Sequence, residues 1–179
     1  VVAVARGNAP VALNPKALDA VRASRHAVEA AVERGETIYG VNTGFGKLAH
    51  VRIPPEQARQ LQLNLIRSHA SGVGEPLGQD AVRAMMLLRA NSLVIGNSGV
   101  SEQLVALLVG MINAHIAPVV PCYGSVGASG DLAPLAHVSL ALVGEGEVSV
   151  RGTRAGAREA LAAAGLTPIE LRPKEGLAL

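Results

Sequence analysis

The chain has 179 residues, of which 49% are hydrophobic and 17% charged, so it can bury a sizeable core. A net charge of +2 without a basic cluster argues against a nucleic-acid surface, and no apolar run reaches the roughly 18 residues of a membrane span. The single cysteine excludes an internal disulfide and fits a reducing compartment, so we expect a cytoplasmic protein.

Helical patterns dominate the sequence. With only two tyrosines and one phenylalanine, aliphatic and alanine side chains must form the core, which suits close-packed helices. A short edge strand at 11–13 and a small β-hairpin at 147–155 complete a mainly α fold. Caps and periodic apolar positions predict helices at residues 15–34, 54–69, 80–95, 102–115, 132–143 and 157–164.

Two side chains near the first glycine-rich segment could serve a site. Tyr39 begins the segment 37–47, which we interpret as a mobile loop that starts with a brief extended piece. His69 ends the helix 54–69 and can either cap it or reach into whatever the loop encloses. Taken alone, an anchoring aromatic and a capping histidine are the simpler interpretations. The other histidines lack metal-ligand spacing, so we expect no metal site; they are His26, His50, His115 and His137.

A second glycine-rich segment, residues 124–135, reads Gly-Ser-Val-Gly-Ala-Ser-Gly-Asp-Leu-Ala-Pro-Leu and leads into a predicted helix. Its glycine spacing does not match a dinucleotide fingerprint, and an aspartate replaces the last glycine of a nucleophile elbow. The glycines at 40 and 46 are likewise too far apart for a P-loop. Two interpretations of residues 124–135 remain: a plain turn with a helix cap, or a strained loop that carries out chemistry of its own.

The strained loop permits a backbone reaction at Ala128-Ser129-Gly130. The amide nitrogen of Gly130 can attack the carbonyl carbon of Ala128, because glycine has no side chain to obstruct the approach. Ring closure releases one water, and loss of the Ser129 hydroxyl releases a second and leaves an exocyclic methylene. The product is an electrophile made from the chain itself.

Five segments in order resemble the aromatic amino acid ammonia-lyases and, among them, the histidine ammonia-lyases. The segments are residues 39–46, 68–77, 124–135, 144–146 and 174–179. The resemblance covers nearly the whole chain and implies the helical N-terminal part of a fumarase/aspartase-like bundle. It further implies that residues 1–179 are the N-terminal portion of a longer homotetramer, truncated at the C-terminus and, we expect, at the N-terminus.

The resemblance also implies roles for individual residues. Ala128, Ser129 and Gly130 would cyclise into 4-methylideneimidazol-5-one (MIO), with no other cofactor and no metal. Tyr39 would act as the base toward the β-proton, and His69 would help to hold the substrate side chain. Together with its neighbour Ser68, His69 forms a polar pair that favours L-histidine as substrate, giving trans-urocanate and ammonia.

Two alternatives stay open at this point. One is a tyrosine or phenylalanine ammonia-lyase or aminomutase, and the other is a non-catalytic helical scaffold in which residues 128–130 remain an ordinary loop. Residues 96–98, Gly-Asn-Ser, also depart from the Gly-Phe-Ser more usual in similar enzymes. The family's remaining active-site groups would follow residue 179, so we expect the isolated chain to be inactive and its loop uncyclised.

Overall fold

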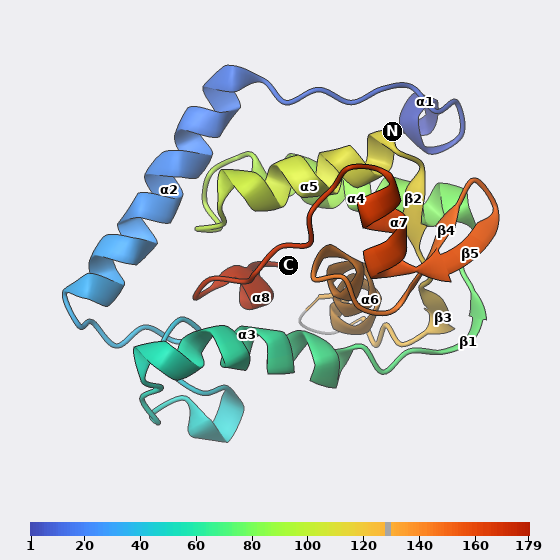
Figure 1. The fold of residues 1–179 in the computed structure, drawn as a ribbon. Helices are drawn as coiled ribbons and strands as arrows, with labels where there is room; N and C mark the ends of the chain where they lie inside the picture. Colours follow the sequence, from blue (N-terminus) through green and yellow to red (C-terminus); the bar gives the residue numbers. More distant parts are fainter. Residues whose placement is uncertain (128–129) are drawn as a thin grey trace.

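The computed structural model describes residues 1–127 and 130–179 and shows a mainly helical fold with two small sheets gathered at one side (Figure 1). The mainly α prediction is confirmed, since α2 to α7 match the six predicted helices with ends within two residues. No helix in these two ranges is long and apolar enough to cross a membrane. The helices are α1 (Val2–Ala5), α2 (Pro15–Glu33), α3 (Pro55–His69), α4 (Gln79–Leu93), α5 (Glu102–Asn113), α6 (Leu132–Leu142), α7 (Ala157–Ala163) and α8 (Glu175–Ala178), with a 3-10 turn at Gly46–Leu48.

Short antiparallel strands join the helices. The strands are β1 (Val73–Pro76), β2 (Ile116–Pro118), β3 (Pro121–Tyr123), β4 (Glu147–Val150) and β5 (Thr153–Gly156). β1 pairs with β3, and β2, β4 and β5 form a three-stranded sheet in that order. β4 and β5 confirm the predicted hairpin; Arg151 and Gly152 between them have φ angles of 50° and 93°, as a type I′ turn requires.

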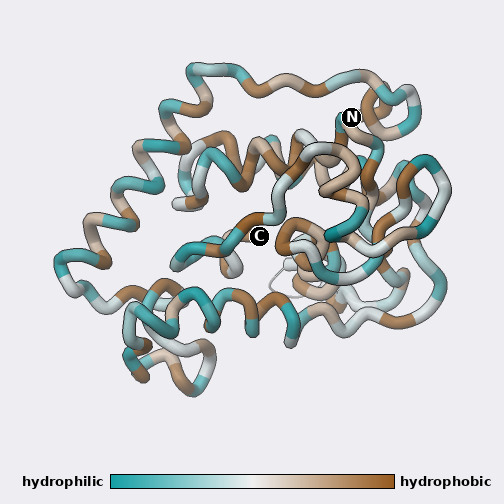
Figure 2. The backbone as a smooth tube through the Cα atoms, viewed as in Figure 1, coloured by the Kyte–Doolittle hydropathy of each residue, from teal (hydrophilic) through white to brown (hydrophobic). Residues whose placement is uncertain are grey.

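The core is centred on α5. Ser101 caps the N-terminus of this helix, and its hydroxyl accepts a hydrogen bond from the Leu104 amide at 3.3 Å. Hydrophobic positions gather on α5 and α6, whereas α2 alternates hydrophilic and hydrophobic positions (Figure 2). A helix that is apolar on most sides must lie inside, and these α5 residues are buried: Leu104, Val105, Leu107, Leu108, Val109, Met111 and Ile112.

The edge strand predicted at residues 11–13 is wrong. This segment has no regular structure, because the side chain of Asn113 forms hydrogen bonds with both the amide and the carbonyl of Val11. The Val11 amide donates to Asn113 Oδ1 at 2.8 Å, and Asn113 Nδ2 donates to the Val11 carbonyl at 2.9 Å. A side-chain amide at the end of α5 thus replaces the strand partner that the alternating pattern suggested.

Candidate active site

A cavity of about 600 Å³ lies between α3, α4, α6, α8 and the loop that carries Tyr39. It brings together three predicted site residues, Tyr39, His69 and Gly130. Ala128 and Ser129 lie outside the described residues. The cavity is lined by Tyr39, Phe45, Gly46, Leu65, Ile66, His69, Arg89, Gly130, Asp131, Leu132, Leu135, Ala136, Ser139, Gly176, Leu177, Ala178 and Leu179.

Buried polar side chains shape the loop on both sides of Tyr39. Asn42 accepts a hydrogen bond from the Ile38 amide at 2.8 Å, and the Thr43 hydroxyl accepts one from the Gly40 amide at 3.1 Å. Such local bonds compete with a regular strand, and the chain turns at residues 39–41 without forming a strand at residues 37–38. Asn42 and Thr43, whose polarity suggested a mobile loop, are buried inside it.

The Tyr39 side chain projects from this loop and is 54% exposed. Its ring meets Phe45 edge-on, with ring centroids 5.9 Å apart and an interplanar angle of 84°. Its hydroxyl accepts a weak hydrogen bond from the Gly46 amide at 3.5 Å. Within residues 1–127 and 130–179, the phenol oxygen is therefore oriented by one long contact and stays accessible to a ligand.

His69 lies in the last turn of α3. Its Nδ1 is 2.8 Å from the Leu65 carbonyl oxygen, which can only accept, so Nδ1 carries a proton. In the neutral ring, Nε2 is then an acceptor. The hydroxyl of Ser68 donates back to the same carbonyl at 2.8 Å, and Ser68 is exposed and does not line the cavity. The structure thus places His69, and not Ser68, at the candidate site.

The glycine-rich segment meets the cavity at the start of α6. Gly127 and Gly130 have φ angles of 64° and 105°, a region that side-chain-bearing residues rarely adopt. Asp131 is the N-cap residue of α6, and its carboxylate accepts a hydrogen bond from the Ser125 hydroxyl. The positive end of the α6 dipole therefore lies beside Gly130, at the cavity wall.

A brace formed by β1, β3 and α6 fixes the beginning of that segment. His137 Nε2 accepts a hydrogen bond from the Gly72 amide at 3.1 Å, which links the residue before β1 to α6. Gly124 packs closely against α6, because an added Cβ would lie 3.0 Å from Ala133 Cβ and 3.2 Å from Gly72 Cα, tighter than ordinary contacts. The start of the glycine-rich segment, at Gly124, is therefore held against α6.

We expect the brace to weaken in acid. Burial lowers the pKa of His137 below its ordinary value of 6.5, so the folded protein favours the neutral ring. The unfolded chain then binds more protons, and the stabilisation, fully present above pH 6.5, is lost as the pH falls toward the folded pKa. The measurement is the melting temperature above and below pH 6.5. We expect it to fall less in acid for His137→Asn than for the exposed control His26→Asn. Equal falls in melting temperature would contradict this.

Sequence reasoning missed Arg89, which lines the same cavity from α4. Burial lowers the pKa of its guanidinium, yet arginine remains charged at neutral pH. The ion pairs among residues 1–127 and 130–179 do not include it. A signal was present, because Arg89 stands on the same helical face as the core residues Met86 and Leu93.

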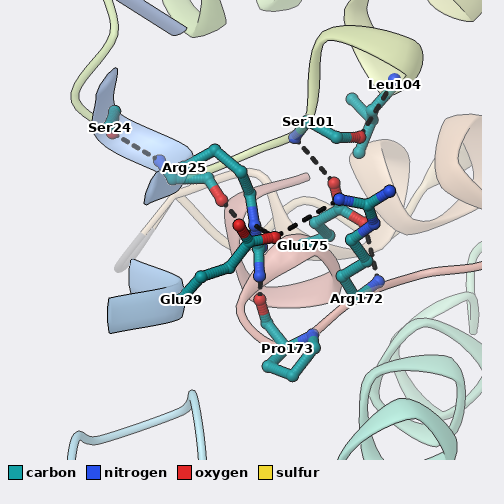
Figure 3. Close-up of polar contacts among 9 residues, drawn as sticks. Ser24, Arg25, Glu29, Ser101, Leu104, Arg172, Pro173 and Glu175 are labelled. Atoms are coloured by element: carbon teal, nitrogen blue, oxygen red, sulfur yellow. Dashed lines mark hydrogen bonds and ion pairs between the residues drawn. The ribbon is translucent and has the colours of Figure 1, made fainter. Parts of the chain in front are cut away.

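The last residues of the chain also form part of the wall, and a buried carboxylate fixes them (Figure 3). Glu175 is fully buried and accepts hydrogen bonds from the Ser101 and Arg172 amides, each at 2.7 Å. Arg25 donates to the Pro173 carbonyl at 2.9 Å. These contacts hold α8 against the beginning of α5, where the helix dipole favours an anion.

The cavity therefore combines an accessible phenol, an imidazole acceptor, a half-buried guanidinium and a helix N-terminus. Such groups can bind a small polar molecule and move a proton. No group of three histidine, cysteine, aspartate or glutamate residues suited to a metal occurs in the described part of the chain.

Comparison with known proteins gives the family. The aromatic amino acid lyase family matches residues 1–179. Histidine ammonia-lyase of Geobacillus thermodenitrificans is 58% identical over 170 residues, which cover 95% of this chain and 34% of that protein. Among solved structures, phenylalanine aminomutase of Pantoea agglomerans has a TM-score of 0.93 and 39% identity, and covers 98% of this chain. Histidine ammonia-lyase of Trypanosoma cruzi has a TM-score of 0.90 and 38% identity, and covers 99%.

The matches run along nearly the whole chain, while the chain spans about a third of each relative, 34% in all three cases. They include the segments that form the cavity wall, from the Tyr39 loop to α8. The fold prediction of an ammonia-lyase-like helical bundle is confirmed by these structures. The chain belongs to the aromatic amino acid lyase family.

Proposed function

We propose that this chain is the MIO-bearing N-terminal part of an ammonia-lyase that converts L-histidine into trans-urocanate and ammonia. The observation that carries the proposal is that Tyr39, His69 and Gly130 line the same cavity. The names of relatives such as the Geobacillus thermodenitrificans enzyme support histidine as the substrate. The polar pair Ser68-His69 supports the same choice, although only His69 lines the cavity.

Residues 128–130 suit the proposed MIO group. Gly130 adopts a φ angle of 105°, which disfavours any residue with a side chain, and it borders both the cavity and the start of α6. When formed, MIO would supply an electrophile that draws electron density from the bound amino acid. Ala128, Ser129 and Gly130 would be its only source, and no metal is part of the proposal.

The remaining residues would bind the substrate and move its proton. Tyr39 would accept the β-proton, and His69 Nε2 would accept a hydrogen bond from the imidazole ring of histidine. A phenol is a poor base at neutral pH without nearby positive potential, which the α6 N-terminus and Arg89 could provide. A positioned base contributes about 10²- to 10⁴-fold, or about 3 to 5 kcal/mol, whereas enzymes supply about 8 to 23 kcal/mol. The electrophile would therefore carry much of the rate enhancement.

The proposal also includes assembly into a homotetramer in the cytoplasm. Large apolar side chains remain exposed near the glycine-rich segment, and their exposed fractions are 70% at Tyr123, 81% at Val126 and 50% at Leu132. Exposed apolar surface beside a site is typical of a protein interface. The single cysteine is consistent with a reducing compartment.

A second candidate is an aromatic aminomutase, which the similarity to the Pantoea agglomerans enzyme favours. Chromatography of the complete enzyme's products from L-histidine, L-phenylalanine and L-tyrosine separates the candidates. We expect urocanate and ammonia in equal amounts from histidine, with far slower turnover of the other two. A β-amino acid product would identify an aminomutase. No turnover of any of the three, with residues 128–130 unmodified by intact mass, would favour the scaffold.

A further inference from the structure

Gln62, on α3, is a fully buried polar residue that makes contacts in two directions. We infer that it is a positioning residue for Tyr39, because its side-chain amide joins the Tyr39 loop to the segment that closes the cavity. The inference rests on the proposed role of Tyr39 as base. Gln62 does not itself line the cavity, so it would act through its neighbours.

Each end of the Gln62 amide has one backbone partner. Nε2 donates to the carbonyl of Gly40, the residue after Tyr39, at 3.1 Å. Oε1 accepts from the amide of Leu177, in the cavity wall, also at 3.1 Å. A donor and an acceptor are needed at the same time, and the Gln62 amide supplies both, so neither loop leaves its buried polar group unpaired.

The Tyr39 loop, α3 and α8 pack closely around Gln62. An added Cβ at Gly40 would lie 2.3 Å from Leu177 Cδ2, and Gly40 has a φ angle of 69°. An added Cβ at Gly176 would lie 2.6 Å from the Gln62 carbonyl oxygen. The Tyr39 loop, α3 and α8 thus pack closely at Gly40 and Gly176, and the Gln62 amide joins the loops there.

Loss of this connection should affect the chemical step more than substrate binding. A catalytic group displaced by about 1 Å can lose about 10²-fold in rate, because proton transfer requires hydrogen-bond reach. Among the described residues, the Tyr39 hydroxyl has only the 3.5 Å contact with the Gly46 amide to hold it, so its position depends on the backbone of its loop. His69 is held separately, by the Leu65 carbonyl on α3.

The test uses the complete enzyme with Gln62→Met and Gln62→Leu, each of which removes both hydrogen bonds. Gln60→Met is the matched control, since Gln60 is exposed on the same helix and bonds only the Asn64 side chain in the described part of the chain. We expect kcat per cyclised subunit to fall about 10²-fold for both Gln62 variants, with KM for histidine changed much less. The kinetic isotope effect with β-deuterated histidine should rise, because proton abstraction becomes slower.

A double-mutant cycle with Tyr39→Phe decides whether Gln62 acts through Tyr39. If it does, Gln62→Met should cost less than about 3-fold in the Tyr39→Phe background. A full loss in both backgrounds, or a lower melting temperature with kcat and isotope effect unchanged, would overturn the inference alone. If Tyr39→Phe itself keeps full activity, both the inference and the base assignment fail.

Discussion

Replacing Ser129 with alanine in the complete enzyme is expected to lower kcat for histidine by more than about 10⁴-fold, beyond the loss caused by removing a general base. Alanine at this position has no hydroxyl to leave, so the exocyclic methylene cannot form. The β-proton of an amino acid is scarcely acidic, and side chains such as Tyr39 and His69 supply no electrophile. The remaining groups can still bind histidine, so its Kd should change far less than kcat.

Intact mass gives an independent measurement of the same change. The complete enzyme should weigh two water molecules less than its sequence, while the Ser129→Ala protein can lose at most the one released by ring closure. Ser71→Ala is a suitable control, because Ser71 is exposed and its hydroxyl makes, among the described residues, only a long 3.4 Å contact with the His69 carbonyl. Undiminished turnover by Ser129→Ala would refute the proposed chemistry.

The helices were predictable because each has an explicit local signal. Asn14 caps α2 by accepting from the Lys16 amide at 2.9 Å, and Ser101 caps α5 in the same way. The β4–β5 hairpin was predictable from Gly152, but its register was not, because Thr153 pairs with Val150 and belongs to β5 and not to the turn. By contrast, β1 contains glycine and proline and is exposed throughout, and β2 and β3 have three residues each. Such strands exist through their long-range partners, which local periodicity does not reveal.

The candidate site shows the same division. Tyr39, His69 and Gly130 stood out because their segments resemble a known family, and the structure places all three at one cavity. Arg89 and Gln62 gave no motif, and their only signal was a polar residue within a buried helical stripe. Whether such a residue faces a cavity or two backbone partners depends on segments far away in the chain, so the sequence could not assign its role.

Replacing Tyr39 with phenylalanine is the second large expected effect. We expect kcat to fall about 10²- to 10⁴-fold, the usual contribution of a positioned acid or base, with KM nearly unchanged. The substitution removes one oxygen atom and keeps the ring, so the edge-on contact with Phe45 is retained. The hydroxyl's only bond among the described residues is the 3.5 Å contact with the Gly46 amide, so little stability should be lost.

Tyr123→Phe provides the matched control for the same chemical change. Tyr123 is 70% exposed on β3 and does not line the cavity, and Tyr123→Phe keeps the ring that the proposed subunit interface would use, so its hydroxyl should be dispensable. Steady-state kinetics of both variants, with melting temperatures and intact masses, separate a lost base from a damaged fold. If Tyr39→Phe forms MIO and melts normally but turns over histidine at the unsubstituted rate, another group must take the β-proton. Arg89 stays protonated, so among the titratable side chains of the wall His69 and Asp131 would remain as candidates.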